Sequence, residues 1–510
     1  MGAFLRKIRE YPLEARLAFT VMLIGILLRF AIASYTVEGG DPCYHLSAAR
    51  FIGRNLQIPL FEPLGREIFA HEPLFHLTAA PFYIAFEQLK MGDLGMHLIS
   101  PIFGSLSLVF SYLISRKLFN LKIALYALIF TAFIPLHIYH STTAHIDMAA
   151  AFFATLSVYL AVNGNFYGSS AAFGLSVLGR INSVFLAPFH AFMVIRRNKG
   201  NYFKILKILA VFFLISFLIL LPWYARNYEL LHNPVWPFLN SFFGGYYSTG
   251  HDRKPDKIGH MLDFKDAYLE VFLALFGVPD GKYESLFLFD SSALRLFVMG
   301  FILFAFFSLI PILFWLFNKP FREKNTSIVL WIALPFIFFL YFYQLNYANT
   351  STRYILGAIP FIGILWALGV DRISRIASPK TIGIFLVSFI LIFSASEMVK
   401  TGFITVKWKS MDKDIEWVQK NTPKDALIIA PGQCFGYRLD RNVYPAKGTG
   451  YNLNPPLDPD IAEIDYIINA DNAVQKPIPK NILEYYLPYF EVIYRNDNTN
   501  FEVYGRKHLY

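Results

Sequence analysis

The stretch that decides how the chain is organised is Glu38-Gly39-Gly40-Asp41-Pro42-Cys43-Tyr44-His45, which leads on to His71-Glu72-Pro73-Leu74. It is the first polar segment after a long apolar run. Asp41 followed by Pro42 predicts the start of a helix, because aspartate caps helix N-termini and proline fits the first helical position. The apolar spacing that follows predicts a short amphipathic helix at a membrane surface. Asp41 is therefore either a helix cap or a chemically active group, and the local sequence leaves both interpretations open.

The composition excludes an ordinary soluble protein. Of the 510 residues, 55% are hydrophobic and 18% are aromatic. Apolar runs long enough to cross a bilayer recur from Arg16 to Lys400. The first run, Leu17 to Tyr35, is too long and too poorly terminated for a cleaved signal peptide, so it predicts a retained anchor. The net charge of +10 gathers in short clusters between apolar runs, which indicates membrane topology rather than binding to nucleic acid.

Clusters of basic residues fix a predicted topology when all of them are placed on the cytoplasmic side. The clusters are Arg6/Lys7/Arg9/Arg16, Arg116/Lys117/Lys122, Arg196/Arg197/Lys199, Lys319/Arg322/Lys324 and Arg372/Arg375/Lys380. The predicted spans are 17–36, 97–115, 123–140, 147–163, a hairpin in 169–195, and then 206–224, 292–317, 327–345, 354–370 and 381–399. We therefore expect a polytopic α-helical protein of the cell membrane with about eleven spans. Its N-terminus would be cytoplasmic and its C-terminus extracytoplasmic.

One apolar segment is not expected to cross the membrane. Leu74 to Leu89 is short and contains His76, Pro81 and Glu87. A full crossing there would move the next basic cluster to the outside. We therefore predict a re-entrant or juxtamembrane segment packed against protein, where backbone is not exposed to lipid.

The chain is predicted to form two domains. The outer face of the membrane domain, residues 1–400, would collect the first outer loop 37–96, the turn 142–147, the loop 225–290 and the turn 346–353. After Lys400 the composition changes to that of a soluble segment. The pattern there predicts helices at 415–419 and 482–486 and strands at 426–430, 466–469, 491–494 and 501–504. Residues 401–510 are therefore expected to form a small extracytoplasmic α/β domain.

Carboxylates and arginines come from different segments of the predicted outer face. Asp41, Glu72 and Asp147 stand at the outer ends of helices, and Arg226 and Arg353 stand on two other segments. An arginine fork binds phosphate with two hydrogen bonds, and a carboxylate can take a proton from an attacking hydroxyl. This combination suits a reaction on a phosphate-linked substrate. Snorkelling arginines and capping aspartates produce charges at helix ends as well, and this interpretation stays open for Arg353 and Asp147.

The histidines and cysteines give no separate site. The histidines of the predicted outer face are His45, His71, His145 and His251. They lack the spacing of ligand pairs on one helix, so we do not expect them to bind a metal. Cys43 and Cys434 form no C-x-x-C motif, and a single bridge between them, which would need both to face an oxidising compartment, is not favoured.

Short motifs in a fixed order over roughly residues 15–400 carry a family resemblance. They are Asp41 then Tyr44 after the first span, His71-Glu72-Pro73-Leu74, Asp147 opening a span, Gly174-Leu175 to Gly179-Arg180, Trp223 with Arg226-Asn227 and Asn233-Pro234, and Arg353-Tyr354 before Pro360. In this order they resemble the GT-C superfamily of integral-membrane glycosyltransferases, and within it the protein O-mannosyltransferases and lipid A aminoarabinose transferases. Glu72 stands where proline is usual, Arg180 where lysine is usual, and Pro42 where the family often has a second acidic residue.

The resemblance implies a polyprenyl- or dolichyl-phosphate-linked sugar as donor and a protein, lipid or glycan as acceptor. It implies that Asp41 is the general base of an inverting transfer and that Arg226 and Arg353 hold the lipid phosphate. The residues implied to shape the sugar and acceptor pocket are Tyr44, His71, Glu72, Asp147 and Tyr354. No cofactor is implied, and a divalent metal stays open.

Two alternatives remain from the sequence. The Asp-Pro-x-Tyr-His string resembles the first loop of oligosaccharyltransferase catalytic subunits, but their Trp-Trp-Asp signature is absent. A transporter or lipid flippase would also explain the many spans and the charges at membrane edges. The lack of a visible internal repeat and the large outer segments favour a transferase.

Overall fold

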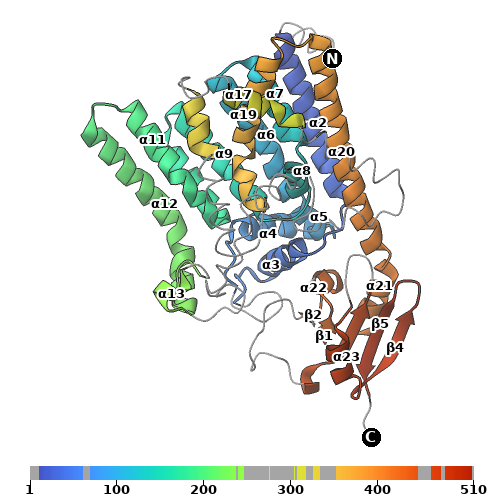
Figure 1. Ribbon diagram of the computed structural model, residues 1–510. Coiled ribbons are helices and arrows are strands. Elements are labelled where there is room, and N and C mark those ends of the chain that lie inside the picture. Colours follow the sequence, from blue (N-terminus) through green and yellow to red (C-terminus); the bar gives the residue numbers. More distant parts are fainter. Residues whose placement is uncertain are drawn as a thin grey trace, which may run out of the picture.

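The computed structural model describes residues 11–60, 69–236, 239–245, 275, 304, 307–317, 325–333, 352–432, 434–445, 461–471 and 477–507. These residues form a helical bundle with a β-sheet near one end (Figure 1). The helices of the bundle are α2 (Leu13–Tyr35), α3 (Asp41–Asn55), α4 (Leu74–Glu87), α5 (Gly92–His97), α6 (Ile99–Leu118), α7 (Leu121–Phe133), α8 (Pro135–Thr142), α9 (Asp147–Asn163), α10 (Phe166–Gly179), η1 (Ile181–Leu186), α11 (Ala187–Arg197), α12 (Tyr202–Leu231), α13 (Asn240–Phe243), α17 (Ile310–Phe317), η4 (Thr352–Ala358), α19 (Ile359–Ile373) and α20 (Pro379–Lys409).

Within the described residues, five helices are long and apolar enough to cross a membrane. They are Leu13–Tyr35, Gly92–Leu118, Tyr202–Leu231, Arg353–Ile373 and Pro379–Asn421. The pair α7 and α8, bent by 58°, adds a sixth if it is one broken span. The predicted spans 292–317 and 327–345 lie largely outside the described residues, so the count of about eleven stays a prediction.

Breaks in the bundle occur where the sequence places prolines and glycines. Pro135 occupies the first turn of α8, which follows the end of α7 at Phe133. The predicted hairpin in 169–195 is broken at Arg180, whose extended backbone separates α10 from η1. The 14 residues of α4 rise about 21 Å, which is less than the thickness of a bilayer core. A helix of this length agrees with the prediction that the segment does not cross fully.

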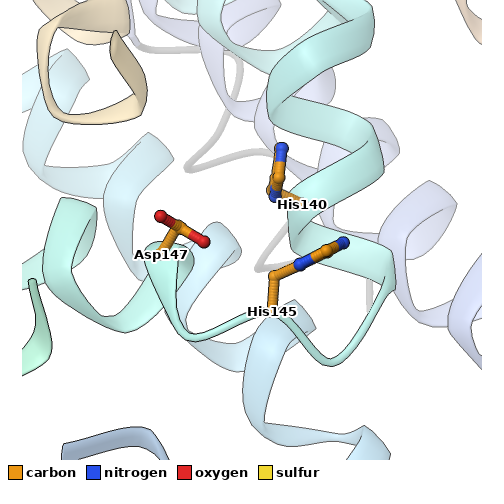
Figure 2. A group of neighbouring side chains, drawn as sticks. All are labelled: His140, His145 and Asp147. Atoms are coloured by element: carbon orange, nitrogen blue, oxygen red, sulfur yellow. The ribbon is translucent and has the colours of Figure 1, made fainter. Parts of the chain in front are cut away.

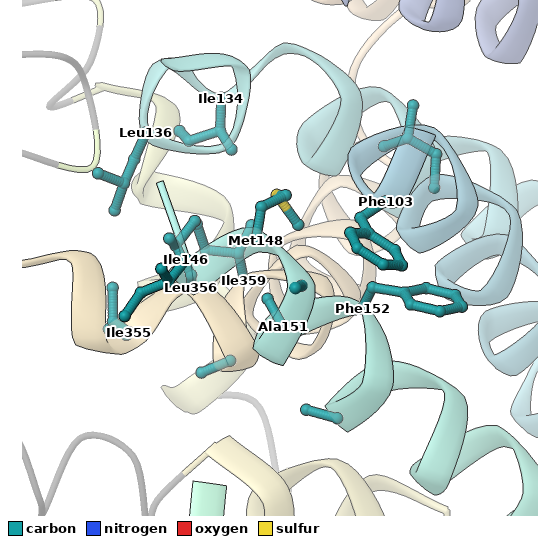
Figure 3. Packing of buried hydrophobic residues seen from close by; sticks show 14 of the residues in the cluster. Phe103, Ile134, Leu136, Ile146, Met148, Ala151, Phe152, Ile355, Leu356 and Ile359 are labelled. Atoms are coloured by element: carbon teal, nitrogen blue, oxygen red, sulfur yellow. The ribbon is translucent and has the colours of Figure 1, made fainter. Parts of the chain in front are cut away.

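A buried apolar cluster fixes the turn between α8 and α9 (Figure 3). Ile146 and Met148, which flank Asp147, are 1% and 0% exposed. On α9, the Phe152 ring stacks on the ring of Phe103 from α6 at a centroid distance of 5.3 Å. Because apolar side chains are packed on both sides of Asp147, the backbone that carries this carboxylate has little room to move.

The described residues after α20 form a five-stranded mixed sheet with the order β2-β1-β3-β5-β4. Its strands are β1 (Leu427–Ala430), β2 (Asn442–Pro445), β3 (Tyr466–Ala470), β4 (Phe490–Asn496) and β5 (Phe501–Arg506), and the helices beside it are α21 (Asp412–Asn421), α22 (Cys434–Leu439), η5 (Ile461–Glu463) and α23 (Lys480–Tyr486). Strand β1 is parallel to β2 and β3, whereas β5 is antiparallel to β3 and β4. Four of these strands lie at the predicted positions, and β2 and α22 were not predicted.

The sheet and the bundle are in direct contact. Helix α22 packs against α3, the helix that begins at Asp41 (Figure 1). Helix α20 runs without a break from Pro379 to Lys409, past the predicted domain boundary at 400/401. The boundary itself stays a prediction, and the contact places the C-terminal elements next to the start of the first outer loop.

Candidate active site

Asp41 is the first residue of α3, as the Asp-Pro pair predicts, but it is not the cap. The N-cap position belongs to Gly40, whose φ of +71° lies in the region that favours glycine. No side-chain cap hydrogen bond forms at this helix end. The Asp41 carboxylate instead accepts a hydrogen bond from Arg353 Nη1 at 2.6 Å. The capping interpretation therefore does not explain Asp41.

The Asp41–Arg353 pair is open to solvent. The side chains of Asp41 and Arg353 are 51% and 26% exposed. Partial burial raises the pKa of Asp41, but the Arg353 guanidinium and His145 outweigh it and lower the pKa below the usual carboxyl value. Asp41 is therefore ionised at neutral pH and bound to a cation that also binds phosphates well.

A second carboxylate–arginine pair lies nearby and is buried. Arg180 Nε is 3.0 Å from Asp147 Oδ1, and its Nη1 is 3.7 Å from Glu72 Oε2. Glu72 also accepts a hydrogen bond from the backbone N–H of Ile181. Arg180 stacks over the ring of Tyr354 at 5.0 Å, and Arg353 lies 6.0 Å from the same ring. The structure thus brings four predicted site residues, Asp147, Glu72, Arg353 and Tyr354, into contact with one arginine or with each other.

Three side chains around the α8–α9 turn have the geometry of a metal-binding group (Figure 2). Ligand atoms of His140, His145 and Asp147 all lie within 4.8 Å of one another, and all three residues are buried. Burial, reinforced by Arg353, lowers the pKa of His145 to about 4, so its imidazole is neutral and able to bind a cation. This group differs from the histidine set considered in the sequence, of which His251 lies outside the described residues. A metal bound here would compete with Arg180 for the carboxylate of Asp147.

Aromatic and imidazole rings line the start of α3. The Tyr44 ring makes edge contacts with His45 and His71 at 5.1 Å and stacks on Phe69 at 6.3 Å. His45 Nδ1 is 3.1 Å from Nε2 of His76. The predicted site residues Tyr44 and His71 therefore lie together, one helical turn from Asp41.

Arg226 has a different environment from Arg353. Its guanidinium donates hydrogen bonds to the backbone carbonyls of Phe69 at 2.8 Å and Pro59 at 3.1 Å, and it lies over the ring of Trp223. These bonds tie two points of the first outer loop, Pro59 and Phe69, to α12. The predicted contact of Arg226 with a phosphate stays a prediction, and binding would have to displace or share these carbonyl bonds.

Comparisons with known proteins agree on one fold. Residues 76–224 match a family model described as dolichyl-phosphate-mannose-protein mannosyltransferase. The chain is similar to ArnT from Cupriavidus metallidurans bound to undecaprenyl phosphate, with 14% identity, a TM-score of 0.65, and coverage of 96% of this chain and 98% of that chain. It is also similar to the oligosaccharyltransferase of Archaeoglobus fulgidus in the apo form, with 14% identity, a TM-score of 0.57, and coverage of 98% and 75%. A comparison with curated protein sequences returns no significant match.

The chain shares its fold with ArnT and with the Archaeoglobus fulgidus oligosaccharyltransferase. The resemblance inferred from the order of the short motifs is thereby confirmed. A third similar structure is archaeal AglB from Archaeoglobus fulgidus in complex with an inhibitory peptide and a dolichol-phosphate, with 14% identity, a TM-score of 0.51, and coverage of 96% and 74%.

Some of the residues that lie at the candidate site were not predicted from the sequence. Arg180 was noted as a departure from the family pattern but was not proposed for the site, although a buried cation in an apolar hairpin is itself a signal of function. His140 lies inside an apolar run and gave no signal. The Cys43–Cys434 disulfide, which was not favoured, is present and joins residues 391 positions apart.

Proposed function

We propose that the chain is a glycosyltransferase that moves a sugar from a polyprenyl- or dolichyl-phosphate carrier to an acceptor hydroxyl. The observation that carries this proposal is the solvent-open ion pair between Asp41 and Arg353 at the start of α3. It places a carboxylate that can accept a proton beside a guanidinium that can bind a phosphate. The GT-C fold supports the donor class, because the similar ArnT structure is bound to undecaprenyl phosphate and the AglB structure to a dolichol-phosphate.

In the proposed reaction, the donor phosphate takes the place of Asp41 on Arg353. The freed carboxylate accepts the proton of the acceptor hydroxyl while the hydroxyl oxygen attacks the anomeric carbon. The bond between that carbon and the phosphate oxygen breaks, and the lipid phosphate leaves with its charge held by the guanidinium. Attack on the face opposite to the leaving group inverts the anomeric configuration.

The surrounding residues have supporting roles in this proposal. The buried Asp147–Arg180–Glu72 group sets the field around Arg353 and supports Tyr354 from one side. Tyr44 and His71, which contact each other near Asp41, would help to shape the sugar pocket. Arg226 would reach the phosphate or hold the loop beside it. The reaction needs no cofactor, and a divalent metal at the α8–α9 turn stays compatible with it.

We place the reaction on the extracytoplasmic face of the cell membrane. The Cys43–Cys434 disulfide supports this, because disulfides persist in oxidising compartments. It is adjacent to Asp41, so the bridge and the site share one side of the membrane. A reporter fused after Tyr510 should be extracytoplasmic and one at Lys199 cytoplasmic. Finding the C-terminal reporter in the cytoplasm would contradict both the orientation and the proposed access to a lipid-linked donor.

Transfer of a whole lipid-linked oligosaccharide is the second candidate, favoured by the similarity to the Archaeoglobus fulgidus oligosaccharyltransferase. The match covers 75% of that protein, and the Trp-Trp-Asp signature of such enzymes is absent from this sequence. We therefore favour a single-sugar donor. Assaying a polyprenyl-phosphate hexose against a polyprenyl-diphosphate oligosaccharide separates the two candidates.

The decisive experiment for the proposed function is Asp41→Asn. Asparagine has nearly the same shape but does not hold a proton as a carboxylate does, so transfer from a polyprenyl-phosphate hexose should fall by roughly a hundredfold or more. Because the ion pair with Arg353 is half exposed, its loss should cost no more than about 1 kcal/mol of stability. Release of polyprenyl phosphate from the reconstituted full chain is the measurement.

The matched control is Asp425→Asn, which changes an exposed aspartate before β1 and should leave transfer unchanged. Near-parental transfer by Asp41→Asn would remove Asp41 as the base. Glu72 or Asp147 would then be the next carboxylate to test.

A further inference from the structure

The four residues that lead into Asp41 are each held by a different contact. Val37 N–H donates to Thr405 Oγ1 at 3.1 Å, Glu38 Oε1 accepts from Ala144 N–H at 2.8 Å, Gly39 lies so close to Trp408 that a Cβ would be 2.7 Å from its Nε1, and Gly40 N–H points to Cys434 Sγ at 3.1 Å. These contacts come from α20, from the α8–α9 turn and from α22. The backbone of residues 37–40, which leads into Asp41, is therefore held in one conformation.

The elements after α20 also bind α3 itself, through a disulfide and several hydrogen bonds. The disulfide joins Cys43, two residues after Asp41, to Cys434 at the start of α22. Arg50 donates to the backbone carbonyl of Tyr437 at 2.9 Å and to Asp440 at 3.2 Å. Arg54 donates to both oxygens of Asp440 at 2.8 and 3.0 Å. One covalent bond and a group of charged hydrogen bonds therefore fix α3 along three of its turns.

Asp41 itself has little packing of its own. Its side chain is 51% exposed, and its described hydrogen bond goes to Arg353, which the proposed reaction requires it to release. When that bond opens, the carboxylate loses its strongest side-chain contact, and its position depends mainly on the backbone of α3. The position of the base then depends on what holds the start of α3.

We propose that the region after α20 is a positioning element of the active site, with Cys434 and Asp440 as positioning residues that keep Asp41 in reach of the acceptor hydroxyl. The proposal rests on the proposed function, since it assigns these residues a role in placing the general base. A domain that merely covered the site would not need a covalent bond two residues from that base.

The positioning role predicts a specific kinetic signature. Loosening α3 should misplace the base without altering Arg353, so kcat should fall while the KM for the donor changes little. A displacement of about 1 Å at a reacting group can cost up to roughly a hundredfold in rate, so we expect a loss of about tenfold or more. A purely structural role would lower the amount of folded protein without this split between kcat and KM.

Two variants test the proposal, namely Cys43→Ser/Cys434→Ser and Asp440→Asn. The second is the milder change, because Asp440 has a φ of +53°, a conformation that asparagine adopts readily. The matched control is Glu484→Gln, which removes the exposed ion pair with Lys480 on α23, in the same region but not in the contact with α3. All are reconstituted as full chains and assayed with a polyprenyl-phosphate hexose.

Amide hydrogen exchange of the peptide covering residues 36–50 provides a readout that does not depend on activity. Both test variants should exchange faster there than the wild type, and Glu484→Gln should not. Faster exchange together with a lower kcat at unchanged donor KM supports the proposal. Unchanged exchange overturns it, and so does faster exchange with an unchanged kcat. If the double cysteine variant fails to fold, Asp440→Asn alone decides.

The experiments distinguish failure of the proposed function from failure of the positioning role. If the wild type releases no polyprenyl phosphate from the tested donors, or if Asp41→Asn keeps full transfer, the proposed function fails whatever the exchange data show. If Asp41→Asn is inactive and both test variants keep the wild-type kcat, only the positioning role is overturned.

Discussion

Two carboxylate–arginine pairs of the candidate site have the same chemistry and opposite surroundings. The side chains of Asp41 and Arg353 are 51% and 26% exposed, whereas those of Asp147 and Arg180 are 3% and 10% exposed. Ion pairs in water contribute roughly 0–1 kcal/mol, so the first pair opens at little cost. Removing one partner of a buried pair strands the other charge and costs about 3–5 kcal/mol. The first pair is therefore suited to exchanging partners with a substrate, and the second to holding the site in place.

The two pairs are not independent. Tyr354 lies between them, with the guanidinium of Arg180 at 5.0 Å and that of Arg353 at 6.0 Å from its ring. Opposite charges alternate from Asp41 through Arg353, Asp147 and Arg180. A donor phosphate bound to Arg353 would preserve this alternation, because one anion, the phosphate, takes the place of another, the Asp41 carboxylate.

Arginine-to-alanine changes should give the largest difference between the pairs. Arg180→Ala leaves Asp147 and Glu72 without their cation in a buried site, so we expect a loss of about 3–5 kcal/mol in unfolding free energy or a failure to insert. Arg353→Ala should cost about 1 kcal/mol or less. Denaturation of the reconstituted variants is the measurement. Equal losses of unfolding free energy in Arg180→Ala and Arg353→Ala would show that burial does not make the Asp147–Arg180 pair more important for stability than the Asp41–Arg353 pair.

A smaller effect is expected for substitutions of Arg353 that probe its link to Asp41. Arg353→Lys keeps the charge but lacks the planar fork, so donor KM should rise and transfer should fall by about tenfold, with stability unchanged. In the wild type, the lowered pKa of Asp41 should keep the acid limb of kcat/KM below the usual carboxyl range.

Removing the cation should shift that acid limb. In Arg353→Gln the largest of the factors that lower the pKa of Asp41 is gone and burial remains, so the carboxylate protonates at higher pH and the acid limb moves upward. Full activity in Arg353→Lys together with an unmoved acid limb in Arg353→Gln would return Arg353 to the role of a snorkelling side chain.

The sequence predicted the helices and strands better than the long-range contacts between them. The helix start at Asp41 and four of the strands follow from local patterns, since proline and apolar spacing act over a few residues. The pairing of Arg353 with Asp41 joins positions 312 residues apart, and the Cys43–Cys434 bridge joins positions 391 apart. No local pattern encodes such contacts. The charge pattern and the family resemblance indicated Arg353 and Asp41 as site residues, but not that they bind each other.

Glu38 offers the smallest and most selective test, because it is a carboxylate with the burial of Asp147 but without an arginine partner among the described residues. Its side chain is 1% exposed, Oε1 accepts from Ala144 N–H, and His97 Nδ1 lies 3.4 Å away. Oε2 has no hydrogen-bond partner in the described part of the chain. Burial therefore raises the pKa of Glu38 to about 8, although the bond from Ala144 opposes the shift.

A raised carboxyl pKa has a definite consequence for stability. The folded chain holds the proton that the unfolded chain loses near pH 4.5, so the contribution of Glu38 is fully present below that pH and is lost as pH rises toward about 8. Glu38→Gln keeps an oxygen that accepts from Ala144 and cannot ionise. The variant and the wild type should therefore melt alike near pH 5, and above it the variant should gain stability relative to the wild type by up to roughly 1.4 kcal/mol per pH unit. Glu416→Gln, an exposed change on α21, should show no such trend. Melting curves of Glu38→Gln and the wild type that stay parallel from pH 5 to 8.5 would show that Glu38 is already ionised in the folded protein, and that a cation outside the described residues, or a bound metal, balances it as Arg180 balances Asp147.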